Sequence, residues 1–313
     1  MDRSIILPIG GLHMNNTRIQ EWKTFVSQIR AEKPLIHHIT NNVTMNFLAN
    51  GVLSAGGSPM MVHDACEVEE AVGVADALVL NIGTIDEASA KSMILALRKA
   101  LYAEVPVVLD PVGVGLSSFR QELVKKLLFE YSELKRVRPR TILTICGNAA
   151  EMQFLAEGAW EGKGVDGDLA TSEDDLIKLA GAAAKQTGCL IAMTGSKDVI
   201  SDGEKAIVLS HGDPMLSYVT GTGCFATSMV ALYQANLKKE VTKETVNMPV
   251  LERTALAILM LTKAAEEAVK TAQGPGSFQQ NLLDQLFQLE TTHEIFHETI
   301  HWQDHMLKEG ANR

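Results

Sequence analysis

Residues 77–82 of the chain read ALVLNI, and residues 106–109 read PVVL. Both are short, unbroken apolar runs bounded by Gly, Pro or Asp, which is typical of strands buried on both faces of a parallel sheet. We predict six further strands from runs of similar length: Leu35–Ile39, Pro59–Val62, Thr141–Cys146, Cys189–Met193, Val199–Ser201 and Ala206–Ser210. The last two are expected to form an antiparallel hairpin at one edge of the sheet.

Longer segments between these runs carry apolar residues at helical spacing. One of them starts with Asn148, which is followed three residues later by Glu151, the spacing of a capping box. We predict helices over seven segments: Val43–Ser54, Asp86–Glu104, Asn148–Ala156, Ser172–Thr187, Cys224–Leu237, Val250–Gln273 and Phe278–Leu289. This order indicates an α/β fold with a mostly parallel central sheet, helices on both of its faces and a helical C-terminal third.

Domain organisation is expected to be simple, because no repeat, low-complexity tract or linker divides the sequence. We predict a single domain over residues 1–313, with a core over about residues 34–289 and a helical tail over residues 290–313. Four histidines recur in the tail at a spacing of four: His293, His297, His301 and His305. Each step of four overshoots a helical turn by roughly 40°, so all four could not share one metal ion. A solvated helical face is therefore favoured over a zinc site.

The composition of the chain excludes several classes of protein and binding partner. Of the 313 residues, 46% are apolar and 21% are charged, which excludes a disordered, collagenous or small disulfide-rich chain. The net charge is −10, so no basic surplus is available to neutralise the phosphates of a nucleic acid. The four cysteines lie far apart without zinc-site spacing, and no apolar run approaches the roughly 20 residues that span a bilayer. We expect a cytoplasmic protein that binds neither nucleic acid nor membranes.

The segment Thr220–Cys224 reads TGTGC and directly precedes a predicted helix. Glycines let successive backbone N–H groups point at one spot, and a helix N-terminus adds roughly half a positive charge there. Such an anion hole suits the charge that develops on a transferred phosphoryl group. Cys224 lies in the first helical turn, where the dipole should lower its pKa. The alternatives are a tight turn that packs a buried helix, and a cysteine that is only a small buried apolar residue.

Two carboxylates follow predicted strands. Asp110 comes directly after PVVL, and ligands bind outside the carboxyl ends of parallel strands, where a metal-binding or charge-tuning carboxylate belongs. An Asp-Pro turn that caps the strand is the alternative. Glu151 lies in CGNAAE, residues 146–151, at another strand end. It is either a helix cap, which the sequence alone favours, or a ligand of Mg²⁺ through water.

Two other segments join apolar strands to polar turns. The first is the pair ITNNVTMNF (residues 39–47) and SPMMV (residues 58–62), whose methionines could line a pocket or fill the core. The second is the turn Thr194–Asp198, whose hydroxyl groups could contact a phosphate or stabilise a hairpin. The residues alone leave both alternatives open.

Taken in order, nine segments resemble the hydroxyethylthiazole kinase family, thiamine-salvage enzymes of the ribokinase-like superfamily. The resemblance extends from about Pro34 to Phe278. The segments are PLIHHITNNV, ANGVLSAGGSPMMV, ALVLNIGT, VVLDPVGVG, CGNAAE, GKGVD, MTGSKDVISDG, VTGTGC and GPGSF. The resemblance implies a ribokinase-like fold.

It also implies an activity: phosphorylation of the hydroxyl of 4-methyl-5-(2-hydroxyethyl)thiazole by ATP with Mg²⁺. Members of the family are homotrimers with the thiazole pocket between subunits, so a homotrimer is expected. Two alternatives are another small-alcohol kinase of the same fold, of the hydroxymethylpyrimidine or pyridoxal type, and an ATP-dependent hydrate dehydratase. A third is a nucleotide-binding homologue with impaired catalysis.

The resemblance implies the following roles on the substrate side. Asn41, Val43 and Met61 would line the thiazole site. The backbone of the glycine loop would form the anion hole, with its first and last residues near the reacting hydroxyl: Gly221, Thr222, Gly223 and Cys224. Many ribokinase-like enzymes have an aspartate base where this chain has a thiol, so Cys224 is expected to have a modest role as base or positioning group.

On the nucleotide side, Asp110 and Glu151 would organise Mg²⁺ and its waters, and Thr194 and Asn148 would contact ATP. One departure from the family concerns Cys146, because relatives commonly have a basic residue there that meets ATP. A neutral thiol cannot form a bidentate phosphate contact. Either another cation compensates, such as Lys197 or Arg120, or the affinity for the nucleotide is weaker. We favour Arg120, which follows the glycine turn after Asp110.

Overall fold

The computed structural model describes residues 5–8, 16–157, 172–237, 248–292 and 302–308. Their strands form one ten-stranded sheet in the order β1-β10-β9-β8-β7-β6-β5-β4-β2-β3. The strands are β1 (Ile5–Pro8), β2 (Leu35–Ile39), β3 (Ser58–Met61), β4 (Ala77–Asn81), β5 (Val107–Asp110), β6 (Leu143–Asn148), β7 (Leu190–Thr194), β8 (Asp198–Ser201), β9 (Lys205–Leu209) and β10 (Trp302–Lys308). Strands β2 to β7 pair in parallel, whereas β8, β9, β10 and β1 add on antiparallel.

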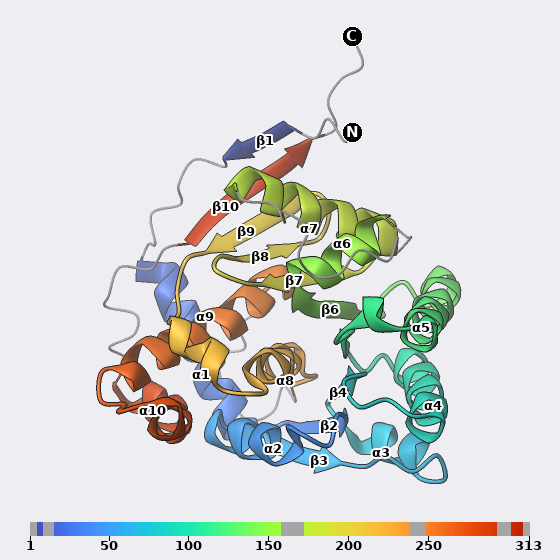
Figure 1. Ribbon diagram of the computed structural model, residues 1–313, viewed down its shortest axis with the longest axis horizontal. Helices are drawn as coiled ribbons and strands as arrows, with labels where there is room; N and C mark the ends of the chain where they lie inside the picture. Colours follow the sequence, from blue (N-terminus) through green and yellow to red (C-terminus); the bar gives the residue numbers. More distant parts are fainter. Residues whose placement is uncertain (1–4, 9–15, 158–171, 238–247, 293–301, 309–313) are drawn as a thin grey trace.

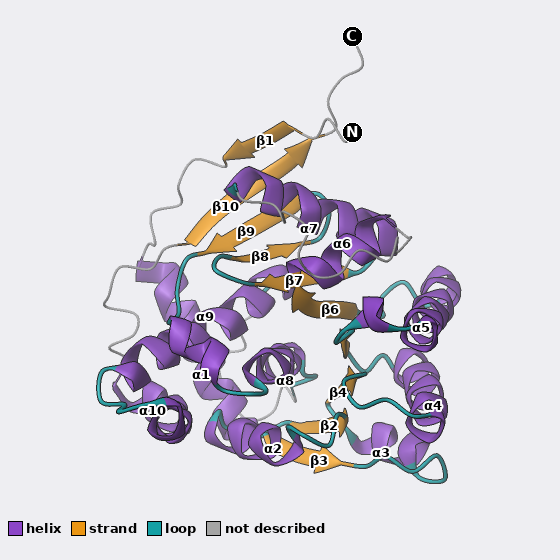
Figure 2. Cartoon of the chain, in the orientation of Figure 1, coloured by secondary structure: helices purple, strands orange, loops and turns teal. Residues whose placement is uncertain are grey.

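Helices cover both faces of the sheet, and Figure 2 shows the strands running between them. The α-helices are α1 (Asn16–Glu32), α2 (Met45–Ser54), α3 (Val68–Val74), α4 (Glu87–Ala103), α5 (Ser118–Val137), α6 (Ala149–Glu157), α7 (Glu173–Thr187), α8 (Thr222–Gln234), α9 (Val250–Val269) and α10 (Pro275–Thr292), with 3₁₀ turns η1 (Val114–Leu116) and η2 (Pro214–Tyr218). Helices α4 and α5 lie on one side of the sheet, and α8, α9 and α10 lie on the other (Figure 1). The predicted fold class, including the helical C-terminal third, is confirmed.

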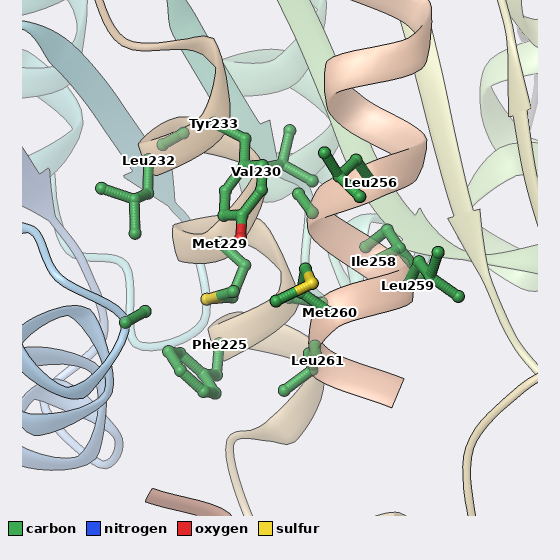
Figure 3. Close-up of a cluster of buried hydrophobic side chains, with 14 of the residues drawn as sticks. Phe225, Met229, Val230, Leu232, Tyr233, Leu256, Ile258, Leu259, Met260 and Leu261 are labelled. Atoms are coloured by element: carbon green, nitrogen blue, oxygen red, sulfur yellow. The ribbon is translucent and has the colours of Figure 1, made fainter. Parts of the chain in front are cut away.

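Helix α8 lies between the sheet and helix α9, and every residue from Phe225 to Gln234 is buried. Its apolar side chains meet those of α9 in a close-packed cluster (Figure 3), which includes Met229, Val230 and Tyr233 of α8 and Met260 of α9. Burial of one such side chain contributes about 1.5–3 kcal/mol. This packing holds the N-terminus of α8 at the carboxyl ends of strands β4 and β5, where the candidate site lies.

The end of the chain differs from the prediction. The hairpin of β8 and β9 is present, but β10 and β1 extend the sheet beyond it, so it is not at the edge. We predicted a helical tail over residues 290–313. This prediction is wrong for residues 302–308, which form β10. This strand pairs with the free edge of β9, and Leu307 packs against Gly181, where a Cβ would lie 2.6 Å from its Cδ1 atom. Sheet pairing and burial here override the four-residue spacing.

Because residues 302–308 form a strand, the prediction that the four histidines form a solvated helical face also changes. His305 is buried on β10, between Ala206 of β9 and Pro8 of β1, so it is not part of a solvated helical face. The other three histidines of the series, His293, His297 and His301, lie outside the described residues.

Candidate active site

The glycine loop begins helix α8 in the conformation that its sequence requires. Gly221 caps the helix with a φ of +94°, and a Cβ on it would lie 2.6 Å from Cγ2 of Thr44. Only glycine fits both constraints. At Gly223 a Cβ would meet no atom of the described chain within 4 Å, so the loop is open on that side. An anion could therefore approach the first turn of α8 from this side.

Asp110 lies next to this turn and is almost fully buried, at 4% exposure. Its Oδ2 atom accepts two hydrogen bonds, from Nδ2 of Asn81 at 2.6 Å and from Oγ1 of Thr227 at 3.1 Å. Asn81 and Asp110 are neighbours because they pair in register at the ends of β4 and β5. The carboxylate is thus held by β4 on one side and by α8 on the other.

Sequence reasoning missed both of these partners of Asp110. Asn81 could have been found, because it ends the apolar run ALVLN just as Asp110 follows PVVL. For Thr227 the signal is weaker: it is one of several hydroxyl residues in a largely apolar helix, three positions after Cys224.

Asn41 connects this carboxylate to Cys224. Its Nδ2 group donates to Oδ1 of Asn81 at 2.9 Å and to Sγ of Cys224 at 3.4 Å. Its Oδ1 atom accepts from the backbone N–H of Thr44 at 3.0 Å. The structure therefore brings three predicted site residues together, Asn41, Asp110 and Cys224, through the amide of Asn81.

Glu151 is both a helix cap and a neighbour of Asp110. Its Oε2 atom accepts from the backbone N–H of Asn148 at 2.8 Å, and Oδ1 of Asn148 accepts from the N–H of Glu151 at 3.0 Å. This is the predicted capping box. Its Oε1 atom accepts from the N–H of Gly113 at 2.9 Å, which ties α6 to the turn after Asp110.

Both carboxyl groups bind a proton more tightly than they would in water. Burial and the negative charge of Glu151 raise the pKa of Asp110 to about 8, and burial raises the pKa of Glu151. The pKa of Cys224 is also raised, to about 12, by burial and by the charge of Asp110. The lowered pKa expected for Cys224 is therefore wrong, because desolvation and a nearby carboxylate outweigh the helix dipole. At neutral pH the group is a thiol.

Comparisons with known proteins identify the family. The family model described as "Hydroxyethylthiazole kinase family" matches residues 26–292. The chain belongs to this kinase family. A hydroxyethylthiazole kinase of Desulfotalea psychrophila is 38% identical over 84% of this chain and 89% of its own length, and one of a Roseiflexus species is 39% identical over 84% and 90%.

Solved structures agree with this assignment. The hydroxyethylthiazole kinase of Pyrococcus horikoshii superposes with a TM-score of 0.76 at 30% identity and covers 91% of this chain and 99% of its own. A ribokinase-like superfamily protein of Enterococcus faecalis, at 12% identity and a TM-score of 0.56, shares the fold, covering 86% of this chain and 93% of its own. The chain is thus a kinase of the ribokinase-like fold, and strands β1 and β10 lie outside the residues that match the family model.

Other residues expected from the hydroxyethylthiazole kinase pattern differ in their surroundings. Met61 is half-buried against the core that contains α8, whereas Val43 is 70% exposed at the turn that carries Asn41. Thr222 uses its hydroxyl to donate to the carbonyl of Leu216 at 2.9 Å, which attaches the glycine loop to η2. Met61 and Val43 thus differ strongly in exposure.

Cys146, the position where the resemblance led us to expect a basic residue, is 1% exposed and belongs to the core on the α8 side of the sheet. Burial strongly raises the pKa of its thiol, which is therefore neutral. Arg120 donates from Nη1 to the carbonyls of Ile82 and Val112 and from Nη2 to that of Gly83, at 2.6–2.7 Å. Arg120 thus holds two strand-end loops together.

Thr194 ends β7 and lines a cavity of about 250 Å³ between the β7–β8 turn and helices α6 and α7. Gly195, Ser196 and Lys197 also line it, and Lys197 forms an ion pair with Glu173 of α7.

In the described part of the chain, no three His, Cys, Asp or Glu side chains are grouped closely enough to hold a metal ion. No helix among the described residues is long and apolar enough to cross a membrane.

Proposed function

We propose that this kinase transfers the γ-phosphoryl group of ATP to the hydroxyl of 4-methyl-5-(2-hydroxyethyl)thiazole. The observation that supports this most is the meeting of Asn41, Cys224 and Asp110 at the open N-terminus of α8. Phosphoryl transfer depends mostly on positioning and on neutralising charge. This arrangement offers a place for an alcohol beside N–H groups that can stabilise a transferring phosphoryl group.

In this proposal, Cys224 positions the substrate and does not accept the proton of its hydroxyl. A thiol with a pKa of about 12 carries no charge at neutral pH, so it is a poor acceptor for the proton of the substrate hydroxyl. The N–H of Asn41 fixes its sulfur, which can then contact the hydroxyethyl group. Asn41 and Met61 would bind the thiazole, with Val43 at the outer margin of the site.

The pair Asp110 and Glu151 fits Mg²⁺, which is usually held by one or two carboxylates together with waters and substrate phosphates. Two buried carboxyl groups whose pKa values are both raised are a setting in which a divalent cation would replace the bound proton. Both oxygens of Glu151 already accept backbone N–H groups, so Glu151 would act through water. Bound there, Mg²⁺ would neutralise negative charge on the phosphates of ATP.

ATP is proposed to approach from the cavity that Thr194 lines, with Asn148 at its margin. The missing basic residue at position 146 must then be replaced. Arg120 already binds three carbonyls, whereas Lys197 lines this cavity and has an exchangeable carboxylate partner in Glu173. Lys197 is thus a stronger candidate than Arg120 for the compensating cation.

A homotrimer with the site between subunits is also proposed. Helix α10 contacts both α2 and η2, and this region carries several exposed apolar side chains: Val43, Leu53, Tyr218 and Phe287. Exposed apolar patches mark surfaces that bind a partner. Light scattering after size-exclusion chromatography should give three times the 34.0 kDa of the chain, and a monomeric mass would reject this part.

The activity is tested by measuring ADP release from Mg-ATP with and without hydroxyethylthiazole. Hydroxymethylpyrimidine and pyridoxal are the comparison substrates. Release stimulated by the thiazole alone is the expected result. Stimulation by another alcohol would keep the kinase and change its substrate. No stimulation with nucleotide still bound would reject the proposal and indicate a binding protein, the alternative that Cys146 raises.

A further inference from the structure

Asn81 lies at the centre of the candidate site, although it is not among its expected residues. It is the last residue of β4, is 2% exposed, and pairs in register with Asp110. Its side chain contacts one proposed substrate-binding group, Asn41, and one proposed metal-binding group, Asp110. A single buried amide thus connects the two halves of the site.

The orientation of this amide is fixed by a backbone group. The N–H of Gly83, which can only donate, lies 2.9 Å from Oδ1 of Asn81. That atom must therefore be the oxygen, and Nδ2 must be the group that faces Asp110 at 2.6 Å. Asn41 is fixed in the same way, because its Oδ1 accepts from the backbone N–H of Thr44.

The hydrogen bonds consequently run in one direction. Asn41 donates to Asn81, and Asn81 donates to Oδ2 of Asp110, which also accepts from Thr227. Oδ2 is thereby occupied by two donors, and the carboxyl group cannot rotate without losing both. Amide groups do not exchange protons readily, so this chain positions side chains and does not carry a proton.

We propose that Asn81 is a positioning residue that couples the alcohol side of the site to the metal and nucleotide side. The inference rests on the proposed function. When the alcohol fixes Asn41, Asn81 is fixed with it, and so is Oδ2 of Asp110. Binding on either side then lowers the ordering cost on the other, so the two ligands bind cooperatively.

The experiment compares Asn81→Leu with Gln234→Leu. Leucine is close to asparagine in size and removes both arms of the link. Gln234 is the matched control, because it is also 2% exposed and its amide donates to Thr144 and Thr254, at the other end of α8. Both variants lose a buried amide, but only the first loses a contact to the site.

The affinity for hydroxyethylthiazole is measured by calorimetry with and without Mg-ADP. In the unchanged protein, Mg-ADP should increase this affinity about fivefold or more, the lower end of typical coupling between sites. The ratio should fall to about one in Asn81→Leu and stay unchanged in Gln234→Leu. A ratio that Asn81→Leu keeps, or a ratio near one in the unchanged protein, would overturn the proposal.

A second readout does not need the thiazole. Binding of Mn²⁺, followed by electron paramagnetic resonance, should weaken about tenfold in Asn81→Leu, because Asp110 is no longer held, and not in Gln234→Leu. Equal Mn²⁺ affinity in all three proteins would overturn the inference. If Asn81→Leu does not fold, Asn81→Ser replaces it, since serine is too short to reach both neighbours. Absence of thiazole-stimulated ADP release alongside the Mn²⁺ effect would count against the proposed substrate only.

Discussion

The two ends of helix α8 use the same backbone for opposite purposes. At its N-terminus, Gly223 faces open space and Cys224 is only partly buried. Toward its C-terminus, Met229, Val230 and Tyr233 are enclosed by α9 and the sheet. The difference shows that α8 can hold the site in place because most of its residues are packed in the core.

The polar groups of the two ends differ in the same way. Near the C-terminal end, Gln234 is fully used by Thr144 and Thr254, at 2.6–3.0 Å. At the N-terminal end, Asp110 accepts hydrogen bonds from Asn81 and Thr227 at Oδ2 and still has a raised pKa. A buried polar group with satisfied partners stabilises a fold, whereas a buried carboxyl group with a raised pKa is a candidate for binding a ligand. Changes at the two ends should therefore affect different quantities.

The largest effect is expected for Asp110→Asn. Loss of the carboxylate should lower kcat about 1000-fold, which corresponds to about 4 kcal/mol of transition-state stabilisation, because the charge that would hold Mg²⁺ is gone. Steady-state rates at saturating ATP and thiazole measure it. A loss below tenfold would show that Asp110 only caps its strand.

At high pH the same variant should be more stable than the unchanged protein. Folding raises the pKa of Asp110 from 3.8 to about 8, so the folded protein binds this proton more tightly, and the residue costs stability as pH rises through that range. Denaturation in the absence of metal should give Asp110→Asn an advantage above pH 8 that shrinks toward pH 4. An advantage that grows toward low pH would contradict the assigned direction.

Leu259→Ala probes the other end of the comparison. Leu259 of α9 is fully buried in the core cluster that also contains α8, so its truncation should lower the free energy of unfolding by about 3 kcal/mol. The value of kcat for the folded enzyme should stay within about twofold, because no site residue is touched. Denaturant titration and rate measurement at low temperature separate the two. A large loss of kcat with little destabilisation would erase the distinction between the ends.

Sequence patterns predicted the apolar part of the molecule best. All eight predicted strands are present within two residues, because strands buried on both faces need unbroken apolar runs such as ALVLN and VVLD. Helices α1, α3 and α5 and strands β1 and β10 were not predicted. In particular, β10 depends on an edge that β9, about 100 residues earlier in the chain, provides, and local spacing does not contain that information.

The candidate site was predicted only in part. Motif order brought Asn41, Asp110 and Cys224 to attention, and the structure joins them. Asn81 was missed because a polar residue at a strand end has many ordinary uses, and only the register between β4 and β5 reveals its contact. The predicted shift in the pKa of Cys224 had the wrong direction, because burial depends on neighbours that the sequence does not place.

Lys197→Met should have a moderate effect that lies outside both ends of α8. If this lysine binds the phosphates of ATP, its loss should raise the KM for ATP about tenfold, or about 1.4 kcal/mol, with kcat nearly unchanged. Glu173→Gln, which removes its ion-pair partner, should lower that KM. Lys125→Met, an exposed change on α5, is the control. If Arg120→Ala raises the KM and Lys197→Met does not, Arg120 is the compensating cation.

The smallest effect is expected for Cys224→Asp, which should retain or raise turnover. A carboxylate accepts a proton from oxygen better than a neutral thiol does, and the N-terminus of α8 stabilises its charge. The nearby Asp110 and Glu151 oppose ionisation, so any gain should appear mainly at alkaline pH. Cys224→Ala, which removes the contact to Asn41, should lower kcat about tenfold. Complete loss of activity in a folded Cys224→Asp protein would mean that the thiol itself is required, and that the open end of α8 is as closely fitted as the packed one.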